Sequence, residues 1–360
     1  MPDMRFAPPN PLRIADRASG LNALSVRSYN ERLVLSLLLQ NETTTRLEIG
    51  EKTGLSAQTI SVIVRSLEQE GLVMKGEAQK GRVGPPTTPL MLNPDGAYSV
   101  GVSVGHQNTH VVLVDFVGNI RFSSSLPHRK IGEFDDLEGA THEVMKAINS
   151  LPPRIQERIA GIGVAIPAPK ESRISTNEEL HRRLEADLGL PVYVQNDIAA
   201  AAAGESLFGV AKPLQDFLFF YLGARLHSRL ILNHQIYNGN SPVSHDVGVS
   251  ALERSLVAEP ELAKSIWNRQ ENWPDLGAAG QQWLQSCAET LVGSIESLSQ
   301  FIEIRTVILS SFIPAEVCSE LALAVERKLP FVQALVGRAS SVPKAVGAAS
   351  LPFSSRFMVE

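Results

Sequence analysis

The chain has 360 residues, of which 44% are hydrophobic and 20% charged, and its formal net charge is −5. This apolar content excludes a disordered chain, and no apolar run reaches the roughly 18 residues of a membrane-spanning helix. Two cysteines are too few for a disulfide framework or a cysteine-rich zinc site, and the first residues lack the apolar core of a signal peptide. We therefore expect a cytoplasmic globular protein of two or three folding units.

Residues 27–82 carry the pattern of three short helices followed by a strand pair. Apolar residues on one helical face predict the first helix, and they are Leu33, Val34, Leu37 and Leu38. Thr45 and Glu48 have the capping-box spacing that begins a second helix, which Gly54 can end. Ser56 can cap a third helix, whose buried face is expected to hold Ile60, Ile63, Val64 and Leu67. An extended run follows from residue 71, and the loop 80–84 is a flexible basic tip.

This order of elements is typical of a winged helix-turn-helix, so we expect residues 24–83 to bind DNA. A small excess of basic over acidic side chains in the first quarter of the chain permits this role. Gln58 can pair with adenine, and Arg65 can reach a guanine or a phosphate. Further contacts, to phosphates or on the same helix face, are expected from Ser56, Thr59, Ser61, Lys80 and Arg82. The alternative is a small helical module that binds a protein and not DNA.

The proline-rich stretch after the wing marks a joint, and we expect a linker over residues 84–95. Beyond it, strand and helix patterns alternate in two blocks of similar size. Strands are predicted at 98–105, 111–115, 120–122, 159–166, 192–194, 217–222, 229–232 and 305–309, the first three as a meander. Helices are predicted at 137–151, 198–208 and 281–301. The pattern indicates an α/β protein of two lobes with a cleft between them.

Six stretches in chain order carry a family pattern: GRVGPP (81–86), LNPDGAYSVGV (92–102), GIGVAIPAP (161–169), LPVYVQNDIAAA (190–201), ILNHQIYNG (231–239) and AVGAASLP (345–352). Together they resemble the ROK family of repressors, open reading frames and sugar kinases, in the branch with a fused DNA-binding domain. The resemblance runs from about residue 28 to the C-terminus. It implies an actin-like (ribonuclease H-like) effector and dimerisation domain over 96–360. Lobe 1 would comprise 96–196 with the C-terminal helix 343–360, and lobe 2 would comprise 197–342.

The kinase motifs of that family are altered here. Where the family has Asp-x-Gly-Gly-Thr, the sequence is SVGHQ (103–107), and Gly-Thr-Gly-x-Gly is replaced by GARLH (223–227). A late Gly-Gly is replaced by Ser310-Ser311. Small residues that let backbone N–H groups approach phosphates are missing, and Leu226 and His227 are expected to fill the phosphate space. We therefore predict a protein that is not an enzyme and needs no cofactor.

The family's zinc site also departs from its usual form. The corresponding region reads SHDVGVSALE (244–253) and contains no cysteine. His245 is expected to be a surface or hinge histidine, and we predict no metal.

The sugar-binding positions of the family are retained in part. The resemblance implies that Asp197, in the Asn196–Asp197 pair, accepts a sugar hydroxyl. Asp246 stands where the family has the glutamate of Gly-Glu-x-Gly-His, Glu253 matches another sugar contact, and Asn177 matches the asparagine of Ser-Pro-Asn. The alternative for Asp197 is to cap the helix that follows it, and for Glu253 to be a solvated helix residue.

The expected function is a DNA-binding regulator, a repressor of carbohydrate uptake or catabolism genes, with a sugar or sugar derivative as effector. It would bind a palindromic operator as a homodimer or a dimer of dimers, because two-fold symmetry places two recognition helices in successive major grooves. One alternative is an interaction platform that has lost its ligand and is fused to a DNA-binding domain. The other is a sugar kinase with a DNA-binding appendage.

Overall fold

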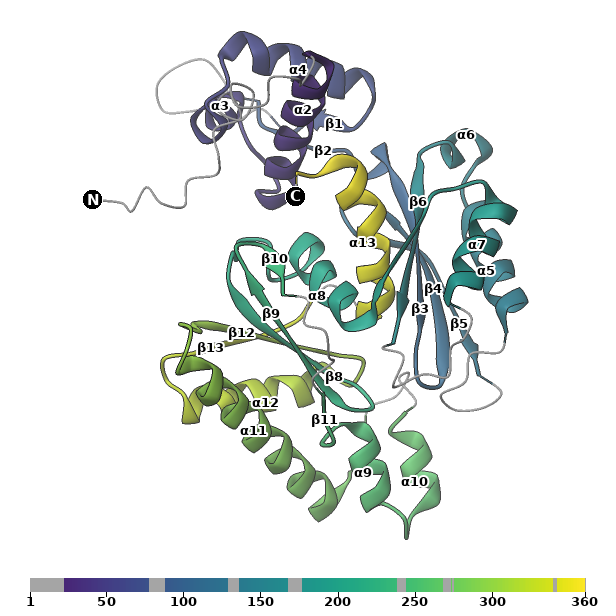
Figure 1. Ribbon diagram of the computed structural model, residues 1–360, viewed down its shortest axis with the longest axis vertical. Helices are drawn as coiled ribbons and strands as arrows, with labels where there is room; N and C mark the ends of the chain where they lie inside the picture. Colours follow the sequence, from purple (N-terminus) through teal and green to yellow (C-terminus); the bar gives the residue numbers. More distant parts are fainter. Residues whose placement is uncertain are drawn as a thin grey trace.

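The computed structural model describes residues 23–77, 88–128, 136–167, 177–237, 244–267, 273, 275–338 and 342–359. Over these ranges the chain forms a small helical unit followed by two larger sheets that carry helices (Figure 1). The predicted α/β architecture, a winged helix-turn-helix and two lobes, is confirmed. None of the helices in these ranges is long and apolar enough to span a membrane.

The N-terminal unit contains three helices and an antiparallel strand pair: α2 (Ala23–Gln40), α3 (Arg46–Thr53), α4 (Ala57–Gln69), β1 (Val73–Lys75) and β2 (Leu90–Leu92). Thr45 and Glu48 form both hydrogen bonds of the predicted capping box, and Gly54 ends α3 with a left-handed φ of 72°. The second strand lies inside residues 84–95, which we expected to be a linker. Because β2 pairs with β1, the N-terminal unit extends to Leu92.

Lobe 1 is built on a five-stranded sheet of order β5-β4-β3-β6-β7. Its strands are β3 (Tyr98–Val104), β4 (Asn108–Asp115), β5 (Ile120–Pro127), β6 (Ile159–Ile166) and β7 (Val192–Asn196). The first three form the predicted antiparallel meander, and β6 and β7 extend the sheet in parallel. Helices on this lobe are α5 (Leu137–Asn149), α6 (Pro153–Gln156), α7 (Asn177–Leu188) and α13 (Pro343–Phe357). Helices α5 and α7 lie on one face of the sheet, and α13 covers the other (Figure 1).

Lobe 2 contains the second sheet, of order β10-β9-β8-β12-β13, with β11 also paired to β9. Its strands are β8 (Phe217–Leu222), β9 (Leu226–Leu232), β10 (Gln235–Ile236), β11 (Ser244–His245), β12 (Thr306–Ser311) and β13 (Gln333–Val336). Its helices are α9 (Val249–Ser255), α10 (Pro260–Ser265), α11 (Gly277–Ser299) and α12 (Ala315–Lys328). Alternate residues of β8 face these helices, and the others face α8 (Asp197–Phe208).

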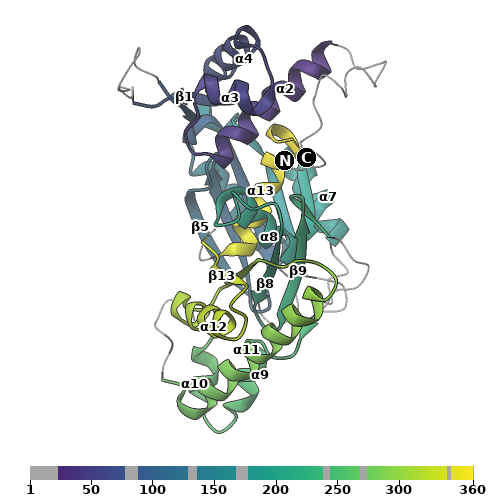
Figure 2. The same cartoon turned by 90° about the vertical axis from the view of Figure 1, so that its left-hand side faces the viewer.

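Helices α8 and α13 pack against each other between the two sheets (Figure 2). Ile198 and Ala201 of α8 contact the strands of lobe 2, while α13 lies directly on the sheet of lobe 1. A Cβ at Gly101 of β3 or at Gly163 of β6 would overlap carbonyl oxygens of α13. Glycine at these two positions therefore allows backbone contact between helix and sheet.

Candidate DNA-binding face and effector site

Helix α4 has one buried face and one exposed face. Its buried side chains are the predicted ones, Ile60, Ile63, Val64 and Leu67. Gln58, Ser61 and Arg65 are exposed, and Val62 beside them is 58% exposed. The exposed groups include an amide and a guanidinium, which can hydrogen-bond to base edges in a major groove.

Ser56 begins α4 as its N-cap. Its Oγ accepts a hydrogen bond from the backbone N–H of Thr59 at 3.1 Å and lies 2.9 Å from Thr59 Oγ1. Ser61 Oγ donates to a backbone carbonyl one turn earlier, at 2.8 Å. These hydroxyls therefore hold the first turns of the helix together. The other two residues expected to contact phosphates, Lys80 and Arg82, lie outside the described residues.

The Asn196–Asp197 pair lies where β7 ends and α8 begins. Asn196 is the N-cap of α8, and its Oδ1 accepts from the backbone N–H groups of Ile198 and Ala199, both at 3.2 Å. The same oxygen accepts from Arg229 Nη2 at 2.6 Å. The N-cap position that we considered for Asp197 therefore belongs to Asn196, because the free N–H groups of a first turn face the residue before the helix.

The carboxylate of Asp197 is almost fully buried and forms an ion pair with Lys344 of α13. Lys344 Nζ donates to Asp197 Oδ2, and Oδ1 accepts from the backbone N–H of Ile198 at 2.9 Å. The two charged side chains are 4% and 19% exposed. The ammonium also lies 4.6 Å from the centroid of the Tyr221 ring. Our sequence reasoning missed Lys344, which lies 147 positions from Asp197. The available signal was a lysine at the start of a tail helix that carries no other charge before Arg356.

His227 borders this ion pair from β9, next to Tyr221 of β8 in the sheet. Its side chain is 7% exposed. Burial, with the positive charge of Lys344, lowers the pKa of His227 to about 4, and the charge of Asp197 opposes this shift. The imidazole is therefore neutral at neutral pH. The elements α8, α13, β8 and β9 thus bring two opposite charges, a phenol ring and a neutral imidazole together.

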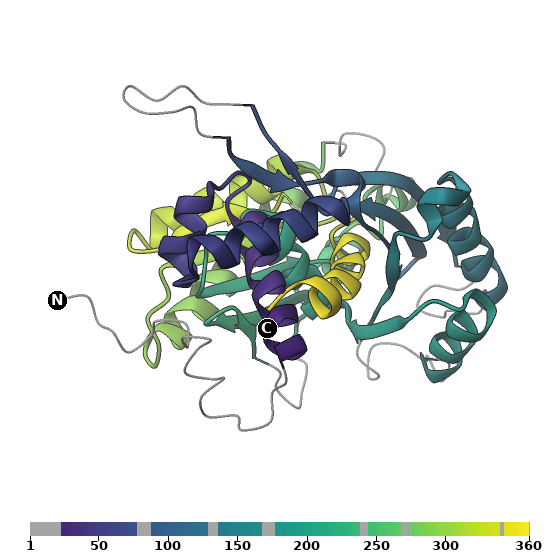
Figure 3. The ribbon, with the colours of Figure 1, turned by 90° about the horizontal axis from the view of Figure 1, so that it is seen from above.

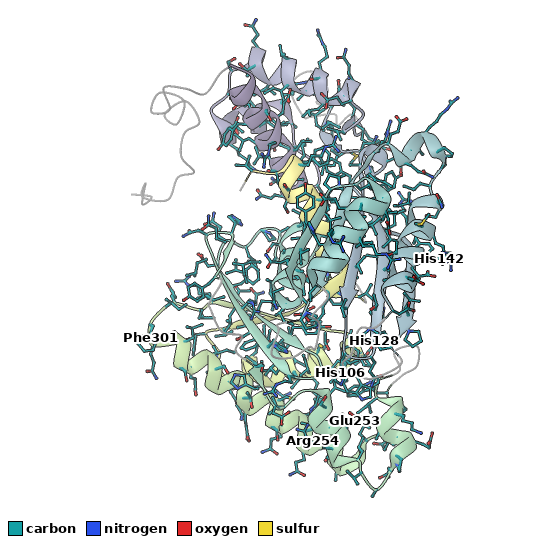
Figure 4. All side chains as sticks on the ribbon, turned by 45° about the vertical axis from the view of Figure 1, so that its right-hand side comes forward. His106, His128, His142, Glu253, Arg254 and Phe301 are labelled. Atoms are coloured by element: carbon teal, nitrogen blue, oxygen red, sulfur yellow. The ribbon has the colours of Figure 1, made fainter. Side chains whose placement is uncertain are left out.

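Asp246 follows β11 and precedes α9, and Glu253 lies within α9. Asp246 is exposed, and a hydrogen bond from Arg254 at 2.7 Å lowers the pKa of its carboxyl group. Glu253 is half-buried and faces His106, which lies in the turn between β3 and β4 (Figure 4). Desolvation lowers the pKa of His106, the charge of Glu253 opposes this shift, and the charge of Lys344 adds to it. His106 is therefore within electrostatic reach of both Glu253 and the buried ion pair.

The two places where the family's kinases carry phosphate loops are tight turns in this protein. The turn between β3 and β4 closes with a hydrogen bond from Gly105 N to Asn108 O at 2.9 Å. The turn between β8 and β9 closes with a hydrogen bond from Gly223 N to Arg225 O at 3.0 Å. In each turn the backbone N–H of the glycine, Gly105 or Gly223, therefore already donates to a nearby backbone carbonyl.

Leu226 and Ser311 have structural roles at these former motif positions. Leu226 begins β9, earlier than predicted, and packs in the core of lobe 2. The expectation that it fills a phosphate space is wrong, because alternate strand residues face opposite sides and His227 alone of the two borders the ion pair. Ser311 Oγ donates to the carbonyl of Leu222 and so links β12 to β8.

In the described ranges, no three His, Cys, Asp or Glu side chains converge as ligands for a metal ion. His245 is half-buried in β11, opposite Leu226 of β9. Cys287 and Cys318 are buried in lobe 2, and burial raises the pKa of each thiol to about 12, so both stay protonated. Asn177 begins α7, and its side chain lies outside the described part of the chain.

Two family models match the sequence. Residues 27–74 match a winged helix-turn-helix DNA-binding model, and residues 99–292, more than half of the chain, match the ROK family model. The xylose repressor of Bacillus subtilis (strain 168) is 27% identical over 62% of this chain and 60% of its own length. The alignments thus span about 60% of the length of the curated xylose repressors.

Solved structures share the fold. A ROK family transcriptional regulator, a homologue of the Escherichia coli MLC protein, aligns with a TM-score of 0.66 at 16% identity, over 92% of this chain and 98% of that one. A ROK family glucokinase from Streptomyces griseus aligns with a TM-score of 0.51 at 16% identity, over 71% of this chain and 99% of that one. The family match and the shared fold agree with the resemblance seen in the sequence, and the chain belongs to the ROK family.

Proposed function

We propose that the protein is a DNA-binding transcription regulator that represses carbohydrate uptake or catabolism genes and responds to a sugar or sugar derivative. The observation that carries the proposal is the exposed face of α4, where Gln58 and Arg65 project opposite a buried apolar face. A winged helix inserts such a face into the major groove. The xylose repressors among its relatives and the MLC-like regulator among its structural neighbours support the same role.

The proposed DNA contacts follow from the chemistry of this face. Gln58 reads adenine, and Arg65 reads guanine or binds a phosphate. Phosphate contacts come from the hydroxyls at the start of α4 and from the wing cations, which are Ser56, Thr59, Ser61, Lys80 and Arg82. We further propose that two or four copies of the chain bind a palindromic operator, because a two-fold axis repeats the α4 face at the spacing of one helical turn of DNA.

The proposed effector site comprises Asn177, Asn196, Asp197, Asp246 and Glu253. Relatives are named repressors for xylose and for N-acetylglucosamine, which makes these two sugars the first candidates. Asp197 is suited to a ligand hydroxyl because a carboxylate accepts strong charge-assisted hydrogen bonds. Its oxygens already accept from Lys344 and from the backbone, so a ligand must share or displace these donors.

We also propose that the chain does not phosphorylate its ligand. The carboxylate that would act as base, Asp197, is engaged by the ammonium of Lys344. Both phosphate-loop positions are tight turns whose first N–H is used internally. A coupled assay with ATP and each of the two sugars tests this, and turnover above background would overturn it.

The DNA-binding proposal is tested by letting the full-length protein select sequences from a random duplex library. We expect an enriched palindrome, which Gln58→Ala binds more weakly than the parent does. The matched control is Gln69→Ala, since Gln69 is exposed on the same helix about three turns farther on. Failure to enrich any sequence would refute the proposal. Equal losses for the two variants would refute the placement of base contacts at the start of α4.

The effector proposal is tested by thermal denaturation of the full-length protein with xylose, N-acetylglucosamine and other sugars. A ligand that binds the folded state raises the melting temperature by mass action. Asp197→Asn is expected to remove that rise. If no sugar raises the melting temperature, the lobes are better described as an interaction platform.

A further inference from the structure

The last residues of the chain are bonded to the DNA-binding unit. Arg32 Nε of α2 donates to the carbonyl of Met358 at 2.6 Å, and the backbone N–H of Val359 donates to Ser36 Oγ at 3.0 Å. Figures 2 and 3 show the C-terminal end of α13 against α2. Met358 also belongs to the same apolar cluster as Leu35 of α2. The DNA-binding unit and the end of α13 therefore share hydrogen bonds and a continuous core.

The other end of α13 lies in the candidate effector site. Lys344 is the second residue of the helix and pairs with Asp197 of α8. Its ammonium also lies over the ring of Tyr221, which belongs to β8 of lobe 2. One flexible side chain therefore links α13 both to α8 and to the sheet of lobe 2.

The body of α13 is packed closely against both α8 and the sheet of lobe 1. A Cβ at Gly347 would overlap the carbonyl oxygen of Ala200 in α8, and Gly163 of β6 approaches the helix equally closely from the sheet. Interiors packed to this density shift as rigid pieces and do not deform continuously. At 15 residues, α13 is about 22 Å long. It therefore joins the candidate effector site to the DNA-binding unit as a single rigid element.

We propose that α13 transmits effector binding to the DNA-binding helices, with Lys344 as the positioning residue that responds to the ligand. This inference rests on the function proposed above. A ligand hydroxyl that donates to Asp197 competes with Lys344 for the same carboxylate. When the ammonium leaves, α13 loses its contact with Tyr221. The apolar contact of α8 with the strands of lobe 2 remains, and lobe 1, α13 and the DNA-binding unit then turn together about it relative to lobe 2.

This mechanism contains the differential contact that a two-state switch requires. Without ligand, the ion pair and the contact with Tyr221 favour one arrangement of the lobes. With ligand, the carboxylate has another partner and that preference is removed. Because Arg32 and Ser36 hold the far end of α13, a turn of this helix carries α4 with it and changes how the protein meets DNA.

The test removes the ion pair in the full-length protein without leaving a buried charge, by the double change Asp197→Asn/Lys344→Met. Either single change would leave one charge without its partner and so lower the stability of the fold. Tyr221→Leu is a second, neutral variant that removes only the ring under the ammonium. The matched control, Glu261→Gln/Lys264→Met, removes an exposed ion pair on α10, away from α13.

Two properties are measured: the dissociation constant for the DNA sequence that the parent selects, and hydrogen exchange of the α2 amides. We expect the ion-pair variant to change the dissociation constant by about five- to 150-fold, the usual range of coupling between sites, and to alter exchange around residues 32–36. Tyr221→Leu should act in the same direction with a smaller change. The control should leave both properties as in the parent.

A second pair of changes, Arg32→Gln/Ser36→Ala, cuts the contact between α13 and α2. In this background we expect removal of the ion pair to have no further effect on DNA affinity. Gln40 is exposed at the end of α2, and Gln40→Ala is the control for this pair of changes. In the Gln40→Ala background, removal of the ion pair should change DNA affinity as much as it does in the parent.

The outcomes separate the two proposals. If the parent selects no DNA sequence, the proposed function fails and this inference fails with it. If the parent binds DNA but the ion-pair variant and Tyr221→Leu match the control in both measurements, the inference alone is overturned. It is overturned equally if the two pairs of changes alter DNA affinity additively, because each end of α13 then acts by itself.

Discussion

The neutral, buried imidazole of His227 should make the stability of lobe 2 depend on pH. In the unfolded chain this side chain takes up a proton near pH 6.5, whereas in the folded protein its pKa is lowered to about 4 by burial and by the charge of Lys344. Between these two values the unfolded state binds more protons. The free energy of unfolding therefore falls as the pH falls from about 6.5 to about 4, and His227 contributes no pH dependence above about pH 7.

The size of the effect follows from the difference between the two pKa values. Each unit corresponds to 1.36 kcal/mol, so the full loss below pH 4 is about 3 kcal/mol. At pH 5 roughly 2 kcal/mol of it is already lost relative to pH 8. This is a large fraction of the 5–15 kcal/mol that typically separates a folded domain from its unfolded state.

Urea denaturation of the parent and of His227→Gln from pH 5 to pH 8 measures this contribution. The sequence contains three tryptophans, all in lobe 2, so their fluorescence reports on the lobe that contains His227. The carboxylates contribute equally to the free energy of unfolding of parent and variant, so their contribution cancels in the difference between the two. We expect this difference to change by roughly 2 kcal/mol from pH 5 to pH 8. His142→Gln, at an exposed position of α5, is the control and should show a constant difference. A constant difference for His227→Gln as well would refute the assignment of a neutral, buried imidazole.

Three further predictions concern the DNA-binding unit and the ion pair. Arg65→Ala should weaken binding to the selected DNA by about 1–3 kcal/mol with an unchanged melting temperature, and a fall in melting temperature would mean that Arg65 supports the fold. Asp197→Asn should lower the free energy of unfolding in urea by about 3 kcal/mol, because the charge of Lys344 is left without its partner. Adding Lys344→Met should recover most of that loss, and additive losses would contradict the pairing. Thr45→Ala should lower the same free energy by about 1 kcal/mol through loss of the capping box, and no change would show that α3 needs no cap.

The sequence was a reliable guide wherever the decisive interactions are local. The capping box of Thr45 and Glu48 spans three positions, and the left-handed end of α3 at Gly54 depends on one residue. The buried face of α4 repeats with the period of a helix, so its opposite face could be predicted as well. The first two strands of the meander in lobe 1, β3 and β4, were predicted for the same reason, because apolar, β-branched residues run almost continuously in strands that are largely buried.

The sequence also indicated the family, because several short motifs occur in the order that the family requires. The sequence could not predict which of two neighbouring residues at the start of β9, Leu226 or His227, faces the core of lobe 2. Leu226 was expected in a ligand space, yet it belongs to the core of lobe 2. A shift of one position in the start of β9 exchanges the two faces, and pairing with β8 decides where the strand begins.

Tertiary structure alone decided the central features of the candidate site. Asp197 and Lys344 lie 147 positions apart and meet only because α8 and α13 pack against each other between the sheets. The same packing places the C-terminal residues on α2, and strand pairing makes β2 part of the wing, where composition suggested a linker. Hydrogen-bonding patterns within a turn or a helix are set by neighbouring residues. The partner of a buried charge, in contrast, is set by which backbones can approach closely, and that depends on glycine and alanine at contacts that no local pattern reveals.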